Sequence, residues 1–266
     1  MRFKRSFGQV FLRDKTYIKK IVHHLKSDNE VILEIGPGSG VVTRRLLERC
    51  KKLYCVEKDL SLVRLLEERF TSEGVVVIYD DILKFNLSSL NTQVLVFGNV
   101  PFNISNRLMQ YLVRNKLWVK QAYLTFQKEF ARKLVAGPNT KEYGFISCYF
   151  QYYTSMRVLF DIPKGAFYPK PEVDASFMEI VFQESPFKIK DEVFLFKLIK
   201  RSFALRRKKL FNALEGFCNK EVIKRTFLDL GLDLGVRAEN LALKEYCFLA
   251  DSILASQKVI DTKQEK

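Results

Sequence analysis

Residues Val94 to Ser105 have the sequence Val-Leu-Val-Phe-Gly-Asn-Val-Pro-Phe-Asn-Ile-Ser. The apolar run that ends at Gly98 has the length and composition of a buried parallel strand. In open sheets of alternating strands and helices, ligands bind beyond the carboxyl ends of the strands, and Asn99 directly follows this strand. The stretch therefore predicts a parallel α/β sheet with a ligand site at Asn99.

The residues after this strand carry the groups needed to recognise an exocyclic amine on a planar ring. The side-chain oxygen of Asn99 and the carbonyl of Val100 can each accept one N–H of such an amine. Pro101 fixes the turn without adding a donor, and Phe102 offers an aromatic face for stacking. The alternative is an ordinary loop in which Asn99 bonds its own backbone and Phe102 belongs to the core, since Asn and Pro are common turn residues.

A glycine-rich turn follows an earlier apolar strand, which begins at Val31. Glycines at 36, 38 and 40 let the backbone approach a ligand closely. The spacing is G-x-G-x-G, preceded by Glu34, and differs from the G-x-G-x-x-G of dinucleotide enzymes. With Gly36 and Gly38 in such a tight loop, the amino-acid and ribose part of S-adenosylmethionine fits better than a pyrophosphate.

Two further strands end in acidic residues. Glu57 follows the apolar run 53–56, roughly twenty residues beyond the glycine loop, where a carboxylate can accept both ribose hydroxyls. The alternative is an exposed acid that caps the helix expected over 60–70. Asp81 follows the run 75–79 and is placed to accept from an adenine amine, with Ile82 against the ring and Asp80 in solvent. This ordered set predicts an S-adenosylmethionine-dependent methyltransferase that acts on a ring amine.

The remaining pattern predicts further strands over 122–126, 157–162 and 176–182, and helices over 17–25, 127–135 and 143–153. The loop between the last two strands contains Pro169 and Pro171, so Phe167 could be held over a substrate base opposite Phe102. The alternative is a hydrophobic plug in a long hairpin. Strand signals end near residue 184, which predicts a domain over 1–183 and a helical, basic domain over 184–266.

The chain is strongly basic, with 45 Lys and Arg against 30 Asp and Glu, a net charge of +15 and a pI of about 9.5. This favours a polyanionic partner, and nucleic acid is the first candidate. Basic and aromatic residues alternate near the N-terminus, around Arg5 and Arg13, and a basic run without acids follows later. A solvated basic surface is the alternative. The residues of this run expected to contact phosphates are Arg201, Arg206, Arg207, Lys208 and Lys209.

Other functional classes are not favoured. No apolar run approaches the ~20 residues of a transmembrane helix, and no signal-like segment opens the chain, so neither a membrane nor a secreted protein is expected. The five cysteines form no C-x-x-C pair and the only histidines are adjacent, which argues against a metal site and for free thiols in the cytoplasm.

Taken together, the motifs resemble the ribosomal RNA (rRNA) adenine N6-dimethyltransferase family, the KsgA group. The resemblance covers nearly the whole chain and rests on the segments 7–12, 34–38, 99–105, 127–129 and 167–174, together with Glu57 and Asp81. It implies a Rossmann-like class I methyltransferase domain, with a seven-stranded, mostly parallel sheet whose last strand is antiparallel, followed by a small all-α domain. Cofactor-binding residues implied by the family are Val10, Leu12, Gly36, Glu57, Asp81 and Asn99.

Two positions depart from the family pattern. Val10 stands where the family usually has Asn, and Phe102 stands where Tyr is usual; the second change keeps the ring face. The segments 201–214 and 237–241 resemble the small-subunit enzymes, which implies a monomer that methylates two adjacent adenines in a hairpin near the 3′ end of small-subunit rRNA, on an assembly intermediate. The rivals are a large-subunit adenine methylase of the macrolide-resistance type and a non-catalytic ribosome-assembly or transcription factor.

Overall fold

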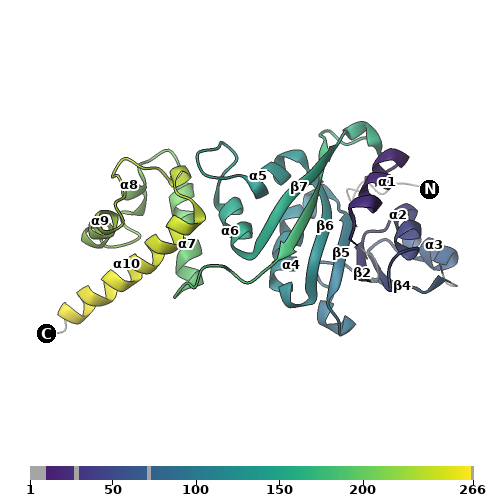
Figure 1. Cartoon of the computed structure of the whole chain (residues 1–266), viewed down its shortest axis with the longest axis horizontal. Coiled ribbons are helices and arrows are strands. Elements are labelled where there is room, and N and C mark those ends of the chain that lie inside the picture. The colour runs from purple at the N-terminus through teal and green to yellow at the C-terminus, as the bar shows by residue number, and fades with distance from the viewer. Residues whose placement is uncertain (1–9, 27–29, 71–72, 265–266) are drawn as a thin grey trace. The chain divides into compact units, whose positions relative to one another are not determined.

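The computed structural model describes residues 10–26, 30–70 and 73–264 (Figure 1). The chain divides into two compact units, of which unit 1 is Met1–Ala131 with Thr154–Gln183 and unit 2 is Arg132–Tyr153 with Glu184–Lys266. A single boundary after residue 183 was expected. Residues 132–153 group with the C-terminal helices instead, because Cys148 and Tyr152 pack in the same hydrophobic cluster as those helices.

Unit 1 is built on a seven-stranded sheet of order β4-β3-β2-β5-β6-β9-β7. Five strands from β2 to β6 are parallel neighbours, whereas β9 is antiparallel to both β6 and β7. The last strand of the chain is thus the antiparallel one, as expected. The strands are β2 (Val31–Ile35), β3 (Lys52–Glu57), β4 (Val75–Tyr79), β5 (Val94–Asn99), β6 (Val119–Gln127), β7 (Thr154–Ile162) and β9 (Ala175–Phe182).

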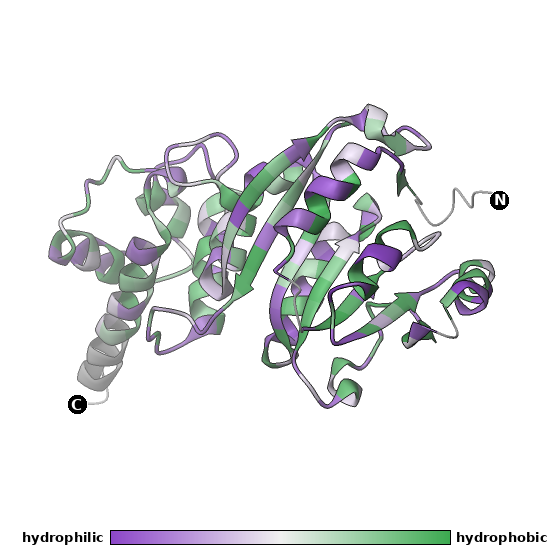
Figure 2. Ribbon diagram, turned by 45° about the vertical axis from the view of Figure 1, so that its right-hand side comes forward, coloured by the Kyte–Doolittle hydropathy of each residue, from purple (hydrophilic) through white to green (hydrophobic). Residues whose placement is uncertain are grey.

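The central strands are buried because helices flank the sheet (Figure 1). In β5 the residues before Asn99 are buried, which explains its uninterrupted apolar sequence. Figure 2 shows the same strands as mostly hydrophobic ribbon. The helices are α1 (Lys15–His24), α2 (Val41–Leu47), α3 (Leu60–Phe70), α4 (Ser105–Arg114) and α5 (Lys128–Val135), with short 3₁₀ turns at Leu87–Leu90, Phe102–Ile104, Lys116–Trp118 and Lys164–Ala166.

A second, two-stranded sheet was not expected from the sequence. It pairs β1 (Phe11–Leu12) with β8 (Phe167–Tyr168) in antiparallel register, with Phe11 opposite Tyr168 and Leu12 opposite Phe167. Strands of two residues carry too little periodicity to be recognised in a sequence. The pairing joins Phe11 and Leu12 to the segment that follows β7.

Unit 2 is helical within its described residues, as expected for the region after residue 184. Its helices are α6 (Phe145–Tyr153), α7 (Glu192–Ala204), α8 (Leu210–Leu214), α9 (Lys220–Asp229) and α10 (Leu243–Gln264), with a 3₁₀ turn at Ala238–Asn240. The aromatic segment 143–153 is a core helix, since Cys148, Phe150 and Tyr152 are buried. None of the helices in the described parts of the chain is long and apolar enough to cross a membrane.

Candidate active site

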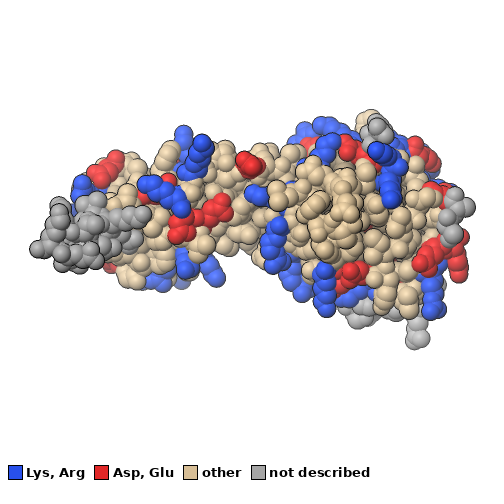
Figure 3. Space-filling view, turned by 90° about the horizontal axis from the view of Figure 1, so that it is seen from below, with Lys and Arg blue, Asp and Glu red and all other residues tan. Residues whose placement is uncertain are grey.

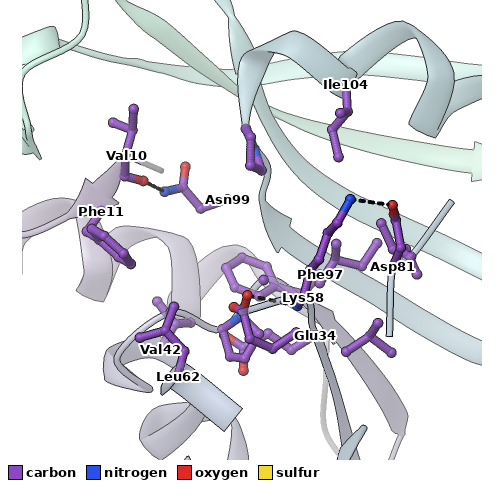
Figure 4. Close-up of a pocket in the computed structure, with 18 of the residues that line it drawn as sticks. Val10, Phe11, Glu34, Val42, Lys58, Leu62, Asp81, Phe97, Asn99 and Ile104 are labelled. Carbon is purple, nitrogen blue, oxygen red and sulfur yellow. Dashed lines mark hydrogen bonds and ion pairs between the residues drawn. The ribbon is translucent and has the colours of Figure 1, made fainter. Parts of the chain in front are cut away.

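A cavity of about 250 Å³ lies at the carboxyl ends of β2, β3 and β5 (Figure 4). Parallel strands bring their carboxyl ends to one edge, so residues that lie far apart in the sequence meet there. Nine of the residues predicted for the site line it: Val10, Leu12, Gly36, Gly38, Glu57, Asp81, Ile82, Asn99 and Pro101. We call this cavity the cofactor pocket.

The side chain of Asn99 is oriented by the backbone of Val10. Asn99 Nδ2 donates to the Val10 carbonyl oxygen at 2.9 Å (Figure 4). Because a carbonyl oxygen can only accept, the group that faces it is the NH₂, and Oδ1 lies on the other branch of the amide. Among the described residues, none donates a hydrogen bond to Oδ1. The acceptor needed for an amine is therefore available. Val10 orients Asn99 through its backbone carbonyl, which a residue of any type at this position would supply.

The N-terminal segment is held in place by the β1–β8 pairing. Arg13 N–H also donates to the Ala166 carbonyl at 2.8 Å, as does Asp14 N–H at 3.2 Å. These bonds connect residues about 150 positions apart and bring the Val10 carbonyl to Asn99.

Phe167, which the sequence analysis placed either over a substrate base or as a hydrophobic plug, is a buried residue. Its side chain is 4% exposed and packs in a hydrophobic cluster of unit 1, with Phe102 partly buried against the same cluster. The hydrophobic-plug alternative therefore describes Phe167 in this structure, because pairing with Leu12 directs its ring into the core. Phe102 and Val100 do not line the cofactor pocket, and Val100 is buried, so only its backbone remains as a candidate contact.

The glycine loop bounds one end of the pocket. Gly36 has φ +62°, a left-handed value that L side chains rarely adopt, and a Cβ added there would meet no atom within 4 Å. At Gly38, with φ +60°, an added Cβ would lie 2.6 Å from the Phe11 ring. The open space at Gly36 fits a ligand that approaches the backbone, as the amino-acid part of S-adenosylmethionine would.

Glu57 is held rigidly at the end of β3. It is 7% exposed, and its Oε1 accepts the backbone N–H groups of Lys58 and Asp59, each at 2.9 Å. Burial raises the pKa of Glu57, and the N–H groups of Asp59, Lys58 and Gly38 only partly offset that effect. A carboxylate fixed in this way at the pocket wall can accept two hydroxyl groups of a ribose.

Asp81 forms an ion pair that the sequence analysis did not foresee. Its Oδ2 accepts from Lys58 Nζ at 2.7 Å (Figure 4). Its Oδ1 accepts from Leu83 N–H at 3.1 Å. Burial alone would raise the pKa of Asp81, but these two donors outweigh it and hold the pKa below its ordinary value. Lys58 lines the pocket as well. In the sequence, the position of Lys58 directly after Glu57 was the only signal that could have identified Lys58 as a pocket residue.

Glu34 is a second residue of the pocket that was not assigned a role. It is 2% exposed, and Cys55 Sγ donates to its Oε2 at 3.7 Å. Burial raises the pKa of Glu34 to about 7. The signal was present in the sequence, since an acidic residue in an apolar strand directly before a glycine loop must lie at the edge that binds ligands.

Lysines and arginines are scattered over the face of both units that Figure 3 shows. The predicted RNA-binding residues differ in whether they have partners within the chain. Arg206 donates through Nη1 to the Lys141 carbonyl at 2.8 Å, through Nη2 to the Thr140 carbonyl at 3.0 Å, and through Nε to Glu239. Arg201 Nε donates to the Ala213 carbonyl at 3.0 Å. Arg206 is therefore held through all three guanidinium nitrogens by partners within unit 2, whereas Arg201 is exposed. Phosphate contact stays a prediction for both arginines.

Exposed cations from the same prediction remain on both units. In unit 2 these are Arg201, Arg207, Lys208 and Lys209. In unit 1, the Arg13 guanidinium lies 4.1 Å from the centroid of the Tyr168 ring. Arg5 lies outside the described residues.

Metal ligands do not gather in the described parts of the chain: no group of three or more His, Cys, Asp or Glu side chains there could hold an ion. The five cysteines have free thiols.

Comparison with known proteins identifies the family. The model of the ribosomal RNA adenine dimethylase family matches residues 1–254. Curated relatives include the ribosomal RNA small subunit methyltransferase A of Bacillus thuringiensis and that of Bacillus cereus, each 34% identical over 95% of this chain and 91% of the relative.

Solved structures share the fold. A dimethyladenosine transferase from Plasmodium falciparum superposes with a TM-score of 0.82 at 21% identity, covering 93% of this chain and 98% of that one. The 23S rRNA methyltransferase ErmE gives a TM-score of 0.73 at 20% identity, over 91% and 99%. The Rossmann-like methyltransferase fold with C-terminal helices is thus confirmed. The chain belongs to the ribosomal RNA adenine dimethylase family, whose enzymes depend on S-adenosylmethionine.

Proposed function

We propose that this enzyme methylates the N6 amines of two adjacent adenines in a hairpin near the 3′ end of small-subunit rRNA, on an assembly intermediate of that subunit. The target subunit is inferred from the relatives of 34% identity, which are named as small-subunit methyltransferases. We further propose that the enzyme acts as a monomer in the cytoplasm and takes part in small-subunit biogenesis.

The cofactor would be held by groups from three strands. The backbone at Gly36 and Gly38 would receive its amino-acid part, Glu57 its ribose hydroxyls, and Asp81 with Ile82 its adenine. Leu12 of β1 and the preceding Val10 would close the pocket on the side of the N-terminal segment. When bound, S-adenosylmethionine supplies an electrophilic methyl group on a sulfonium.

The orientation of Asn99 is the observation that carries the proposal. Its Oδ1 would accept one N–H of the adenine amine and the Val100 carbonyl the other, which keeps the nitrogen lone pair available. Pro101 would fix the turn that brings these two acceptors together. Phe102 would stack on the flipped base. An amide does not take up a proton at neutral pH, so Asn99 would orient the amine, and the proton released after methylation would pass to water.

Phosphate contacts complete the proposal. In unit 2, Arg207, Lys208 and Lys209 are exposed and would bind the RNA backbone. Arg5 and Arg13 would do so from the N-terminal segment. An alternating basic and aromatic arm suits phosphates and stacked bases.

The decisive experiment offers radiolabelled S-adenosylmethionine with undermodified small subunits and, separately, with protein-free large-subunit rRNA. The modified bases are then mapped. We expect two adjacent N6,N6-dimethyladenines near the 3′ end of the small-subunit rRNA. Labelling of large-subunit RNA alone would establish the resistance-type activity instead, and labelling of neither would favour a non-catalytic factor.

Cofactor binding is tested independently of RNA. Glu57→Ala removes the proposed ribose acceptor and should weaken S-adenosylmethionine binding by about 10- to 100-fold, measured by calorimetry, since hydrogen bonds to a charged group contribute roughly 1.5–3 kcal/mol. Unchanged affinity would contradict the assigned role of Glu57.

A further inference from the structure

A second cavity of unit 1, separate from the cofactor pocket, is lined by cations. It has a volume of about 570 Å³ and is bounded by α1, α2, α3 and the end of the glycine loop, and we call it the α1–α3 groove. Half of its ten lining residues are basic, and among the described residues that line it none is acidic. The basic residues are Lys15, Lys19, Arg44, Arg45 and Arg69.

The three arginines of the groove have internal partners. Arg44 Nη1 donates to both carboxylate oxygens of Glu73, at 2.7 and 2.8 Å. Arg45 Nη1 lies 3.5 Å from Glu48 Oε1. Arg69 Nη1 donates to the Ser39 carbonyl at 2.8 Å. These bonds fix the arginine side chains along the groove, while all three residues stay exposed.

The two lysines of the groove differ from the arginines. Lys15 and Lys19 are exposed and form no ion pair with any residue in the described ranges of the chain. They lie four positions apart on α1, so their ammonium groups lie on one face of that helix, and like charges at this spacing cost roughly 0.2–0.5 kcal/mol. Lys15 is also the first residue of α1, where the helix dipole disfavours a cation. Neither position helps α1, whereas an anion in the groove would offset both costs.

The groove adjoins the cofactor pocket. Ser39 and Val41 line both cavities, so the same loop bounds the proposed methyl-donor site and the groove. The floor is apolar and rigid, because Ile18 and Phe70 are buried. An extended ligand lying in the groove would thus pass beside the loop that contacts the cofactor.

We propose that the α1–α3 groove binds phosphates of the rRNA sugar–phosphate backbone. The identity of the polymer rests on the proposed function. A polyanion fits better than a single small anion because the cations come from three helices around a wide cavity and are all exposed, whereas no buried donor set converges on one point. The net charge of +15 favours the same class of partner.

The test replaces Lys15 and Lys19 together by Gln, which removes the charge and keeps a polar, unbranched side chain of good helix propensity. The matched control is Lys51→Gln with Arg64→Gln, two exposed cations of unit 1 that line neither cavity. Binding of a fluorescent small-subunit 3′ hairpin RNA is measured by anisotropy from 50 to 300 mM salt. Calorimetry with S-adenosylmethionine and thermal melting serve as independent measurements.

The Lys15→Gln, Lys19→Gln variant should lower the slope of log Kd against log salt by about 1.4 to 1.8 relative to wild type, since each phosphate that is no longer neutralised lowers the slope by ~0.7–0.9. Cofactor affinity should not change, and the melting temperature should not fall, because the substitution removes two unfavourable charges from α1. The control should keep the wild-type slope. An unchanged slope, or an equal reduction in the control, would overturn the proposal. So would binding to anionic lipid vesicles that depends on Lys15 and Lys19 while RNA binding does not.

This readout is independent of catalysis. If wild-type enzyme binds the hairpin but methylates only large-subunit RNA, the proposed substrate fails while the slope still tests the groove. If the substrate is correct and the slope is unaffected, only the groove proposal fails.

Discussion

Asn99 in unit 1 and Arg206 in unit 2 both form hydrogen bonds to chain segments distant in sequence. They differ in how many of their hydrogen-bonding atoms remain without a partner. Asn99 uses its NH₂ on Val10 and keeps Oδ1 without a donor from the described residues. Arg206 uses all three guanidinium nitrogens on Glu239, Lys141 and Thr140. Both residue types suggested ligand contacts in the sequence. The comparison shows that the hydrogen-bonding capacity left after folding separates a candidate functional residue from a structural one.

The largest expected effect is at Asn99. Asn99→Ala removes the side-chain acceptor and should lower methyl transfer by on the order of 10³-fold, as loss of a preorganised hydrogen-bonding group typically does, while RNA binding stays near wild type. Turnover is measured with labelled cofactor. The control is Val10→Ala, which keeps the backbone carbonyl and should stay within a few-fold of wild type. Near-normal turnover in Asn99→Ala would show that the unpartnered Oδ1 of Asn99 does not take part in methyl transfer.

The second prediction concerns Glu34, a pocket residue whose hydrogen-bond partners do not offset the effect of burial on its pKa. Its pKa rises from the ordinary 4.5 to about 7, so between these values the folded state binds a proton that the unfolded state has released. Stability must therefore fall as pH rises through this window and level off above it. The size is roughly 3 kcal/mol.

The measurement for Glu34 is urea unfolding from pH 4.5 to 8 for wild type and for Glu34→Gln, which cannot ionise. The variant should lack this decrease. Identical pH profiles for the two proteins would show that Glu34 does not titrate in this range.

Arg206→Gln tests the opposite case, in which all donors have partners. The variant should lose roughly 2 kcal/mol of stability, because up to three carbonyl or carboxylate acceptors lose their donor while a side chain about one-third exposed is partly screened by water. Hydrogen exchange should show this loss of stability as faster amide exchange in residues 132–153 and 184–256.

Arg207→Gln is the matched control for Arg206→Gln, since Arg207 is exposed. It should leave stability within about 0.5 kcal/mol of wild type. Equal destabilisation by both substitutions would mean that the internal bonds of Arg206 are not what holds the segment.

The smallest effect concerns RNA affinity alone. Replacing Arg207, Lys208 and Lys209 by Gln should reduce the salt dependence of RNA binding by roughly one unit of slope for each phosphate that these cations neutralise in the wild type, with no change in cofactor affinity. Anisotropy with the hairpin RNA measures it. If the slope is unchanged, these residues form a solvated basic surface and do not bind the RNA backbone.

Much of unit 1 could be predicted because its signals are local. Each buried parallel strand is a short apolar run, and the polar residue that ends it, such as Glu57, Asp81 or Asn99, must lie at the ligand-binding edge. The glycine loop was recognisable since left-handed φ values at Gly36 and Gly38 need glycine.

The errors arose where the partner of a residue is distant in sequence. Phe167 was expected over a substrate base, but its partner is Leu12, and pairing across about 150 residues buries the ring. Residues 132–153 were assigned to the first domain because strand signals continue after them, up to about residue 184. Which core they join depends on contacts with helices after residue 184.

By itself, the sequence determined the order of strands and helices, the polar groups at the carboxyl edge and the chemistry that those groups favour, because periodicity and residue type act over a few positions. Only the tertiary structure decided which of these groups retain unused hydrogen-bonding capacity. The Val10 carbonyl orients Asn99, Lys58 pairs with Asp81, and Thr140, Lys141 and Glu239 occupy Arg206. Each of these contacts exists only once the folded chain has brought distant donors and acceptors within about 3 Å of each other.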